Sequence, residues 1–488
     1  MTVTIQTLDK ILKDFYLGPI IEALNSQVEM VQLFQKSVLD WSGRQVVIPI
    51  HVGRNSGVAF ANESAGDGGG GKGDTLPTAG QQTHVNLNVT AKYLYGRFSL
   101  SGPAIATART TANSFATYVE SEMDGLVRDV KVQANQEMFV GGSAIGFIHE
   151  QVNMAAGAQK NWAFSGNIDI ASSMQAEARA AGRFFVHADA QLAVRITRLD
   201  TYETVTHANT DDPENWALGD TTAVFISGPF VEGQINLTAK NTSGGVNLST
   251  LVGNSAALVE VVSCGVDAGG GAGNFNNGGG SGLDGKDWYT ARIKPTQEGI
   301  YSNLGKKSFF GNNRSTASNS PLRSTIQSID MTSTQLATLN FGRMQNMLDE
   351  ILILGGEDPD CIYVHPGMRQ EYASLVTVTG SGTTLRKDVQ GGPGTADVGY
   401  SGYAFNGIPL KMSRHCGKGL MVFLRTKVWT ITELQSFGMA DLDGNVLSRV
   451  SSRDEFEGYV RWYYNLVCKE PNRNAILCGI KFPGSTNV

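Results

Sequence analysis

The feature that most constrains the fold is a long amphipathic helix, expected between Pro103 and Phe139. Apolar side chains recur there at steps of three and four residues, which places them on one face of a helix. Gly102 and Pro103 mark its start, and Gly141 and Gly142 follow its end. Such a helix would be roughly 55 Å long at about 1.5 Å per residue, so other elements must pack along it. The expected apolar face consists of Ile105, Ala108, Ala112, Phe115, Val119, Met123, Leu126, Val130, Ala134 and Met138.

Two strands are expected before this helix, from Arg44 to Val52 and from Val85 to Tyr95, because apolar and polar residues alternate there. Pro49 restricts the first strand to the edge of a sheet. The glycine-rich segment from Glu63 to Thr83 separates the strands, so the pattern predicts a two-stranded arm with a flexible tip. A lone hairpin buries too little apolar surface to offset its ordering entropy, and we therefore expect a second copy of the chain to cover it. The face to be covered carries Val46, Ile48, Ile50, Val52, Val85, Leu87, Val89, Ala91, Tyr93 and Tyr95.

Composition excludes several classes of protein. The 488 residues are enough for a sizeable core and more than one domain. The formal charge of −6 argues against a dedicated nucleic-acid-binding protein, which needs an excess of Lys and Arg. No apolar run is long enough for a transmembrane helix, and the N-terminus lacks a signal-peptide layout, so we expect cytoplasmic synthesis and no membrane partner. Five cysteines are scattered without CxxC spacing and are expected to be reduced thiols: Cys264, Cys361, Cys416, Cys468 and Cys478.

The first and middle parts of the chain differ in their patterns. Helical spacing from Ile5 to Leu39, broken at Gly18-Pro19, predicts an N-terminal arm of one or two helices. The segments from Arg183 to Val231 and from Leu258 to Val262 are rich in strand patterns and predict a small all-β insertion. A glycine- and asparagine-rich loop follows from Gly265 to Gly285.

From Thr332 onward the pattern becomes α/β. A helix with apolar positions from Leu336 to Leu352 should end at Gly355-Gly356. The last two strand patterns, Phe456 to Val467 and Ala475 to Phe482, are expected to pair with each other. Six further elements are expected between the helix that ends at Gly355-Gly356 and these last two strands. They are the strand Cys361 to Val364, a short helix over Pro366 to Leu375, a glycine-rich loop from Val376 to Gly399, and the strands Tyr403 to Met412, Leu420 to Leu424 and Val428 to Ile431.

Two loop patterns resemble ligand sites. Gly66 to Lys72 matches the first part of a phosphate-binding loop, but Gly73 stands where Ser or Thr should hold magnesium, and Pro77 follows where a helix should begin. Asp441, Asp443 and Gly444 resemble a calcium loop with the wrong spacing, and a hairpin turn is favoured there. We therefore expect no cofactor-binding and no metal-binding residues.

Three side-chain groups have the residue types needed for catalysis. His415 and Cys416 could form a base and a nucleophile, but neighbours on a strand point to opposite faces. His365, before Pro366, is expected to be a structural hydrogen-bonding residue. A solvated loop is favoured over paired catalytic carboxylates for the acidic group Glu357, Asp358 and Asp360. We expect no catalytic residues and no enzymatic activity.

One basic segment, from Gly299 to Ile329, has a functional alternative. It contains Lys306, Lys307, Arg314 and Arg323 and no acidic residue. An ordinary surface loop is the favoured interpretation. The alternative is a surface that contacts DNA phosphates without reading sequence.

Taken in order, the expected elements resemble the major capsid protein of tailed bacteriophages, which has the Hong Kong 97-like fold. At residue level the resemblance lies in Lys92 to Pro103 before the long helix, in Ile362 to Pro366 before a helix, and in Tyr403 to Pro409. Nothing in the sequence identifies the family's occasional lysine-to-asparagine cross-link, and we do not assign Lys72 to one. The resemblance implies an α+β fold with an N-terminal helical arm (1–41), an extended β-hairpin arm (42–102), a spine helix (103–140), a peripheral domain (141–331) with a β-rich insertion at about 180–262, an axial α/β domain (332–435) and closing strands of the peripheral domain (436–488).

The resemblance also implies a function, which is self-assembly into pentamers and hexamers that form an icosahedral head shell enclosing phage double-stranded DNA. The implied partners are further copies of the chain, scaffolding, portal and decoration proteins, and packaged DNA held by non-specific contact. The implied location is the virion capsid, assembled in the host cytoplasm. Two alternatives stay open: an encapsulin-like compartment that encloses protein cargo, and a soluble enzyme with an unrecognised site. Nucleic acid inside the particle would distinguish a phage capsid from an encapsulin-like compartment, and a small oligomer would indicate a soluble enzyme.

Overall fold

The structure is a computed structural model of the chain, and it describes the residues given at the end of this paragraph. Most of the expected N-terminal arm, the arm tip, the first part of the long helix and the loops at 267–285 and 380–399 lie outside them. The described residues are 29–37, 41–53, 55, 57–58, 79–102, 112–151, 159–166, 190–204, 224–231, 234–239, 256–266, 297–329, 336–379, 403–440, 448–449 and 453–482.

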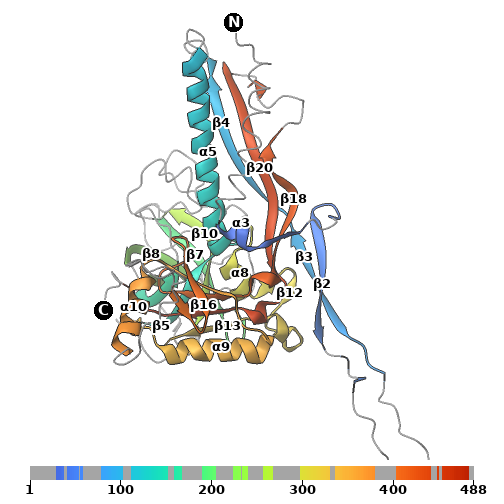
Figure 1. The fold of residues 1–488 in the computed structure, drawn as a ribbon, viewed down its shortest axis with the longest axis vertical. Coiled ribbons are helices and arrows are strands. Elements are labelled where there is room, and N and C mark those ends of the chain that lie inside the picture. The colour runs from blue at the N-terminus through green and yellow to red at the C-terminus, as the bar shows by residue number, and fades with distance from the viewer. Residues whose placement is uncertain are drawn as a thin grey trace, which may run out of the picture.

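A long helix and two long strands form a blade that rises from the rest of the molecule. The blade consists of α5 (Ala112–Val140), β4 (Lys92–Ser101) and β20 (Glu455–Cys468), which run side by side in Figure 1. β4 and β20 are antiparallel and pair along the whole of β4. The helix expected from the sequence is therefore confirmed from Ala112 to Val140. Gly142, with a φ of +70°, follows its end, as the glycine signal predicted.

The faces of the blade follow from the alternation along β4. Phe98 and Leu100 are buried on the side of α5, whose own Val130, Ala134 and Met138 are also buried, as the apolar stripe predicted. On the other side Tyr93 and Tyr95 are exposed. Their expected place on the buried side was wrong, because the pattern breaks at Ala91, where the chain leaves one sheet and enters another.

β20 is the central strand of a five-stranded sheet with the order β1-β18-β20-β19, and β4 also pairs with β20. After the short helix α3 (Glu29–Leu33), β1 (Gln35–Ser37) pairs in parallel with β18 (Trp429–Met439), and β19 is Ser448–Arg449. The expected helix up to Leu39 is therefore wrong over β1. Pairing with β18 outweighs the weak local helical pattern there.

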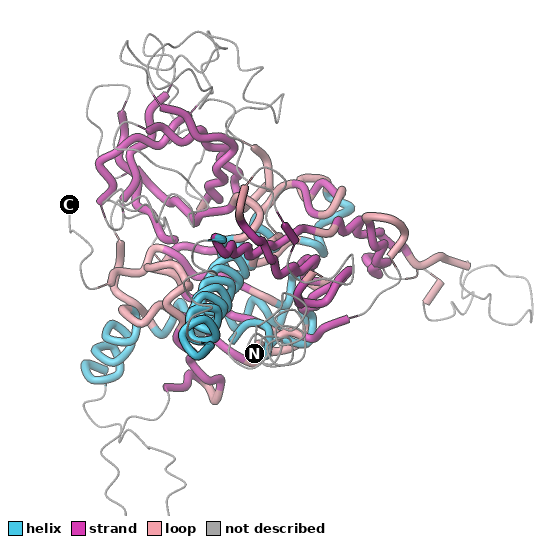
Figure 2. The backbone as a smooth tube through the Cα atoms, turned by 90° about the horizontal axis from the view of Figure 1, so that it is seen from above, coloured by secondary structure: helices cyan, strands magenta, loops and turns pink. Residues whose placement is uncertain are grey.

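Six antiparallel strands close into a barrel, seen as a ring in Figure 2. The order around it is β10-β5-β6-β9-β8-β7. The strands expected at Leu192 to Ile196, Ala223 to Ile226 and Leu258 to Val262 are present, whereas the pattern at Phe184 to Ala188 lies outside the described residues. The barrel also takes two earlier strands, so the β-rich unit begins at Ala144. The sequence of β6 lacks a regular alternation and gave no strand signal. The strands are β5 (Ala144–Gln151), β6 (Gln159–Gly166), β7 (Ala190–Arg198), β8 (Val224–Val231), β9 (Gln234–Ala239) and β10 (Ala257–Val266).

A six-stranded mixed sheet, the axial sheet, has the order β13-β21-β17-β14-β16-β15. The expected pairing of the last two strands is wrong, because β21 pairs with β13 and β17 while β20 pairs with β18 and β4. Both strands are apolar, and apolar character alone does not choose between two sheets. The strands are β13 (Thr325–Ser328), β14 (Cys361–Val364), β15 (Tyr403–Phe405), β16 (Ile408–Met412), β17 (Met421–Leu424) and β21 (Ala475–Cys478).

Two helices accompany the axial sheet, α9 (Phe341–Gly355) and α10 (Met368–Thr379), both near the positions expected. The side chain of Asn340 accepts a hydrogen bond from the backbone N–H of Gly342 at the start of α9, and Gly356, with a φ of +73°, caps its end. Leu352, placed on the apolar face from its spacing, is exposed instead. Among the described helices none is long and apolar enough to cross a membrane.

The expected arm is confirmed as a two-stranded antiparallel ribbon of β2 (Gln45–Gly53) and β3 (Thr83–Thr90), which extends away from the body in Figure 1. Pro49 lies in this two-stranded sheet, where an edge position is available. The expectation that a second copy covers its apolar face is wrong for the base of the arm. The chain itself buries that face in a cluster of Val46, Ile48, Leu87, Val89, Phe309, Leu322 and Val467.

The segment that covers the arm lies between the blade and the axial sheet. It contains α8 (Ile300–Gly305), η5 (Ala317–Leu322) and a small hairpin of β11 (Ser308–Phe309) and β12 (Asn312–Asn313). Two further 3₁₀ turns, η6 (Thr426–Val428) and η7 (Pro471–Arg473), lead into β18 and β21.

Candidate functional site: a buried junction and an exposed tyrosine face

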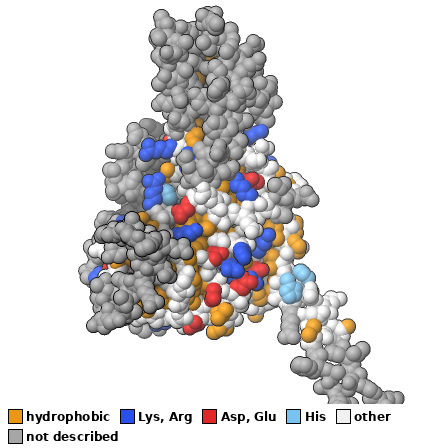
Figure 3. Space-filling model, in the orientation of Figure 1, with side chains coloured by type: hydrophobic (Ala, Val, Ile, Leu, Met, Phe, Trp, Pro, Cys, Tyr) orange, Lys and Arg blue, Asp and Glu red, His pale blue; other side chains and the backbone are white. Residues whose placement is uncertain are grey.

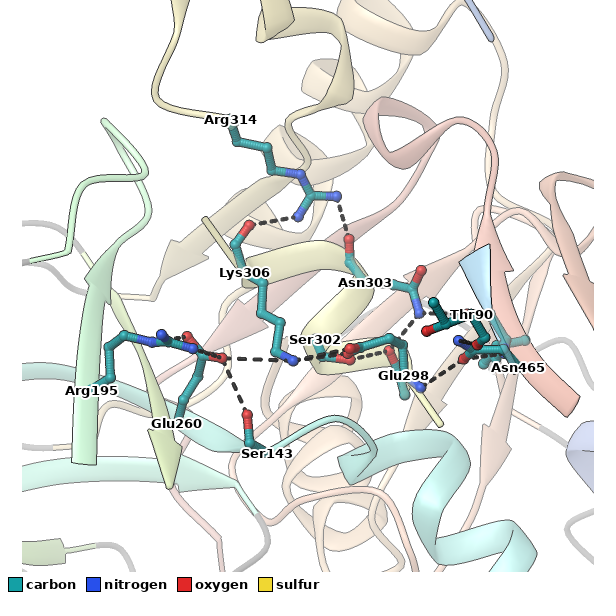
Figure 4. A network of polar contacts seen from close by, with 12 residues as sticks. Thr90, Ser143, Arg195, Glu260, Glu298, Ser302, Asn303, Lys306, Arg314 and Asn465 are labelled. Carbon is teal, nitrogen blue, oxygen red and sulfur yellow. Dashed lines mark hydrogen bonds and ion pairs between the residues drawn. The ribbon is translucent and has the colours of Figure 1, made fainter. Parts of the chain in front are cut away.

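A buried carboxylate, Glu260, connects the barrel to the end of the spine helix (Figure 4). Glu260 on β10 lies directly opposite Arg195 on β7, and Arg195 Nε and Nη2 donate to its two carboxylate oxygens at 3.1 and 3.2 Å. Ser143, just after α5, donates its hydroxyl to the same group at 3.3 Å. Lys306 Nζ lies 3.8 Å from Glu260 Oε1. The carboxylate is thus held by three separate segments of the chain.

The network continues from Lys306 to the base of the blade. Lys306 Nζ donates to both carboxylate oxygens of Glu298, at 3.1 and 3.0 Å. The backbone N–H of Glu298 donates to Asn465 Oδ1 on β20 at 2.9 Å, and Asn465 Nδ2 donates to the carbonyl oxygen of Thr90 at 2.8 Å. This chain of contacts, which we call the junction, joins the barrel, α8, β20 and the end of the arm.

Arg314 forms the second part of the same region, and its side chain is wholly buried. Its guanidinium donates to the carbonyl oxygens of Asn303 and Lys306 and lies 4.0 Å from the centroid of the Phe309 ring. Arg323 donates to the carbonyl oxygens of Arg314 and Ser315 at 2.7 and 2.9 Å.

Neither interpretation of the basic segment therefore holds for Lys306, Arg314 and Arg323. A wholly buried guanidinium and a lysine held between two carboxylates are not available to DNA phosphates, and they do not form an ordinary surface loop. The segment 299–329 has no acidic residue of its own, and the carboxylates that face Lys306 are those of Glu260 and Glu298, which both precede the segment in the sequence. Lys307 contributes its backbone, since its carbonyl oxygen accepts a hydrogen bond from the backbone N–H of Arg314 at 2.9 Å.

The charges of the junction shift the pKa of Glu260. Burial of the carboxylate would raise the pKa, but Arg195 and Lys306, with hydrogen bonds from Arg195 and Ser143, hold it below its usual value. Burial lowers the pKa of the Arg314 guanidinium to about 10, which leaves it charged at neutral pH. The junction is therefore an ionised network inside the protein.

A second candidate site is the outer face of the blade, where aromatic side chains gather in the open. This tyrosine face consists of Tyr93 and Tyr95 on β4 with Tyr459 and Tyr463 on β20. Tyr93 and Tyr463 pack edge to face with ring centroids 4.8 Å apart, and Tyr95 lies 5.7 Å from Tyr463 and 6.3 Å from Tyr459. Tyr93 and Tyr95 are 44% and 54% exposed, although large aromatic rings are usually buried.

Polar contacts fix the geometry of the tyrosine face. The hydroxyl of Tyr95 donates to the hydroxyl of Tyr463 at 3.0 Å, and this hydrogen bond, with partial burial, raises the pKa of Tyr95 to about 12. Arg461 lies over the Tyr463 ring at 5.8 Å from its centroid, and Arg97 pairs with Glu457 across the two strands. The result is an ordered, amphipathic surface of rings, hydroxyls and cations, which is typical of protein–protein contacts.

The structure places His415 and Cys416 in a turn, so the expectation that they lie on a strand was wrong. Cys416 is buried, its thiol donates to the carbonyl oxygen of Tyr363 at 3.8 Å, and burial raises its pKa to about 12. A thiol with this pKa stays protonated at neutral pH and is a poor nucleophile. His415 Nε2 accepts a hydrogen bond from Arg414 Nε at 3.1 Å.

His365 and the acidic group have structural partners. The backbone N–H of Gly367 donates to His365 Nδ1 at 3.1 Å, which confirms the expected structural role. Glu357 forms ion pairs with Arg425 and Arg473 at 2.9 and 3.0 Å.

Asp360 completes this acidic group. Its carboxylate accepts hydrogen bonds from the backbone N–H of Thr426 at 3.0 and 3.1 Å and from its hydroxyl at 2.5 Å. The acidic loop is thus held to η6 and η7, rather than simply solvated as expected.

The remaining site predictions concern ligands and thiols. Four cysteines, Cys361, Cys416, Cys468 and Cys478, are free and buried, as expected for reduced thiols. Within the residues the structure covers, no group of three or more His, Cys, Asp or Glu side chains could hold a metal ion. The phosphate-loop pattern from Gly66 to Lys72 and the pattern from Asp441 to Gly444 lie outside the described residues.

Sequence reasoning missed both the junction and the tyrosine face. Arg195, Glu260 and Glu298 were not singled out, because their partners are far away in the sequence. The tyrosines gave a usable signal, since Tyr93 and Tyr95 are two residues apart and Tyr459 and Tyr463 are four apart, and an even spacing places side chains on one face of a strand.

No protein-family model and no curated protein matches the chain. Among solved structures it is similar to the cyanophage A-1(L) capsid asymmetric unit, with a TM-score of 0.46 and 10% identity over 93% of each chain. A satellite phage P4 procapsid that includes the size determination protein gives a TM-score of 0.37 and 8% identity over 95% of this chain and 99% of that one. The SrpI encapsulin of Synechococcus elongatus gives 0.25 and 11%, over 39% of this chain and 59% of that chain.

The described elements themselves decide the fold. They follow one another as a hairpin arm, a long helix, a β-rich unit, an α/β sheet with two helices, and a long late strand that returns to the blade. This is the order that the sequence led us to expect, apart from the corrected pairings above. The described part of the chain therefore has an α+β fold whose elements follow the order that the resemblance to phage capsid proteins implied.

Proposed function

We propose that this chain is a major capsid protein, which self-assembles into pentamers and hexamers and builds the icosahedral head shell of a phage. Its role is structural rather than catalytic. The shell encloses double-stranded DNA through non-specific contacts, and it is assembled in the host cytoplasm before it becomes part of the virion. Scaffolding, portal and decoration proteins are the further partners of this proposal.

The observation that carries the proposal is the tyrosine face of the blade. On the side of β4 away from α5, Tyr93 and Tyr95 are exposed, and ordered aromatic rings lie there rather than charged side chains alone. Tyrosine is enriched in protein interfaces, because it buries a large ring and still satisfies its hydroxyl. A second copy of the chain that covers this face would bury the rings.

A shell also needs one surface that serves at slightly different angles in five-fold and six-fold rings. The arm supports this requirement, because its base is fixed to the body by the apolar cluster while the ribbon extends outward (Figure 1). Many modest contacts of this kind, repeated around each ring, hold a closed assembly together.

The experiment that tests the proposal is the size of the purified chain, by light scattering after size exclusion and by electron microscopy. We expect capsomers of five or six copies, or closed particles. A monomer or small oligomer that persists at high concentration would contradict the proposal and favour a soluble enzyme. Nuclease-protected DNA inside particles from infected cells is expected for a phage head, whereas protein cargo without nucleic acid would indicate an encapsulin-like compartment.

A further inference from the structure

Two histidines face each other across the arm. His51 on β2 is the direct cross-strand partner of His84 on β3. Their rings are in contact, with centroids 5.4 Å apart and planes inclined by 65°. Both side chains are exposed, and Figure 3 shows histidine side chains gathered on the arm. The proposed shell function gives this pair no role.

The distance between the rings fits two imidazoles that share one tetrahedral metal ion. A Zn–N bond is about 2.0–2.1 Å, and each ring centroid lies about 1.1 Å beyond its nitrogen. Two such rings at the tetrahedral angle would have centroids about 5.2 Å apart. The observed separation of 5.4 Å is close to this value, so the strand register already places the two imidazoles at a distance suited to one shared ion.

The two strands that carry the pair bring no charged side chain that would compete with a divalent cation. β2 and β3 contain no Lys, Arg, Asp or Glu, so neither strand supplies a cation to repel the metal or a carboxylate to occupy an imidazole. Neutral imidazole suits zinc, nickel and copper, whereas magnesium and calcium prefer oxygen ligands. Two protein ligands leave coordination positions open for water or for a group from outside the chain.

We propose that His51 and His84 form a two-histidine chelate for a divalent transition-metal ion of the zinc, nickel and copper class. The bound ion bridges β2 and β3 near the outer end of the described hairpin. It fixes the pairing of the two strands beyond the apolar cluster that holds the base of the arm. Because the ribbon is two-stranded within the residues that the structure describes, a metal bridge restricts its opening.

The test is isothermal titration calorimetry, in which the untagged whole chain is titrated with ZnCl₂ and, separately, with NiCl₂. We expect one ion per chain to bind at this pair. His51→Gln and His84→Gln should each weaken that binding at least about tenfold, because one imidazole cannot chelate. His415→Gln, which removes a histidine outside the pair, should leave it unchanged. The proposal is overturned if the two pair variants bind as tightly as the wild type, or if the wild type binds neither ion at millimolar concentration.

A second measurement uses the wild type alone and does not depend on how the variants fold. Hydrogen exchange of the backbone amides in β2 and β3 should slow when Zn²⁺ is added and recover when a chelator removes it. Exchange that is unchanged in both strands would contradict a bridge across the arm. MgCl₂ at the same concentration controls for ionic strength and should have no effect. These readouts are independent of particle formation, so they remain decisive even if the proposed shell function fails.

Discussion

At the scale of single residues, Glu260 shows how much of this architecture depends on one buried charge. Its carboxylate contacts side chains from β7, from the end of α5 and from the end of α8. A charge in this position is tolerated only because two cations and a hydroxyl satisfy it. The sequence could not reveal this arrangement, because Lys306 and Arg195 have no acidic neighbours at helical spacing that would mark them as paired. Only the closure of the barrel brings β7 and β10 together.

Glu260→Gln removes the negative charge and leaves Arg195 and Lys306 facing each other without it. We expect the free energy of unfolding to fall by about 3–5 kcal/mol, the usual cost of breaking a buried ion pair. Chemical denaturation followed by tryptophan fluorescence measures the change. Asp200→Asn is a matched control, because Asp200 pairs with Arg198 in a more exposed position and should cost at most about 1 kcal/mol. Equal effects of the two variants would show that burial of the junction does not matter.

The lowered pKa of Glu260 also predicts how stability depends on pH. The unfolded chain has a Glu pKa of about 4.3, and the folded value lies below the ordinary one. The stabilisation by this carboxylate is therefore complete above the unfolded pKa and is lost as the pH falls through the folded pKa. The free energy of unfolding of the wild type should exceed that of Glu260→Gln at pH 7, and this difference should shrink below about pH 4. Paired denaturation curves at several pH values measure this difference, and an advantage that grew on acidification would contradict it.

At the scale of elements, the sequence predicted what depends on local pattern and failed where partners are distant. The buried positions Val130, Ala134 and Met138 of α5, the glycine that caps α9 and the first arm strand were predicted correctly, because period and turn chemistry lie within each segment. The second expected arm strand is divided at Ala91 between β3 and β4. The partners of β20 and β21, the strand β1 and the cover of the arm were predicted wrongly. Strand pairing and burial at these places are decided by which sheets meet in three dimensions, and Ala91 gave no local sign that the chain changes sheets.

Close packing of α5 on β4 gives a prediction at this scale. A Cβ added at Gly96 would lie 2.9 Å from Leu126 Cδ1 and from Val460 Cγ2, so Gly96→Ala should push the helix from the sheet and cost about 1–3 kcal/mol. Gly125 is the control within the same blade, because a Cβ there meets nothing within 4 Å. Gly125→Ala should stabilise the helix by roughly 0.5–1 kcal/mol. Urea unfolding midpoints measure both, and destabilisation by Gly125→Ala would contradict the exposed position of this helix face.

At the scale of the whole molecule, the chain buries the base of its own arm, so assembly must depend on other surfaces. The base of the arm does not need a second copy, since Phe309, Leu322 and Val467 of the same chain bury it. Subunit contacts are therefore expected at surfaces that are exposed in the single chain, rather than at the base of the arm. Two of these stand out among the described residues: the tyrosine face of the blade, and the exposed apolar run on α9 from Leu352 to Leu354. They lie on different parts of the molecule, so mutation can separate their contributions.

The double substitution Tyr93→Ser and Tyr95→Ser should weaken assembly while the fold is kept, because both side chains are exposed in the single chain. Interface tyrosines often contribute about 2 kcal/mol or more, so the concentration needed for assembly should rise at least about tenfold. Light scattering over a concentration series measures this threshold, and thermal unfolding checks the fold. Ile353→Ser, at a side chain that is 79% exposed on α9, tests the other surface in the same assay. If Ile353→Ser alone raised the concentration needed for assembly, α9 and not the tyrosine face would form the principal contact. The exposed tyrosines would then no longer support the proposed function.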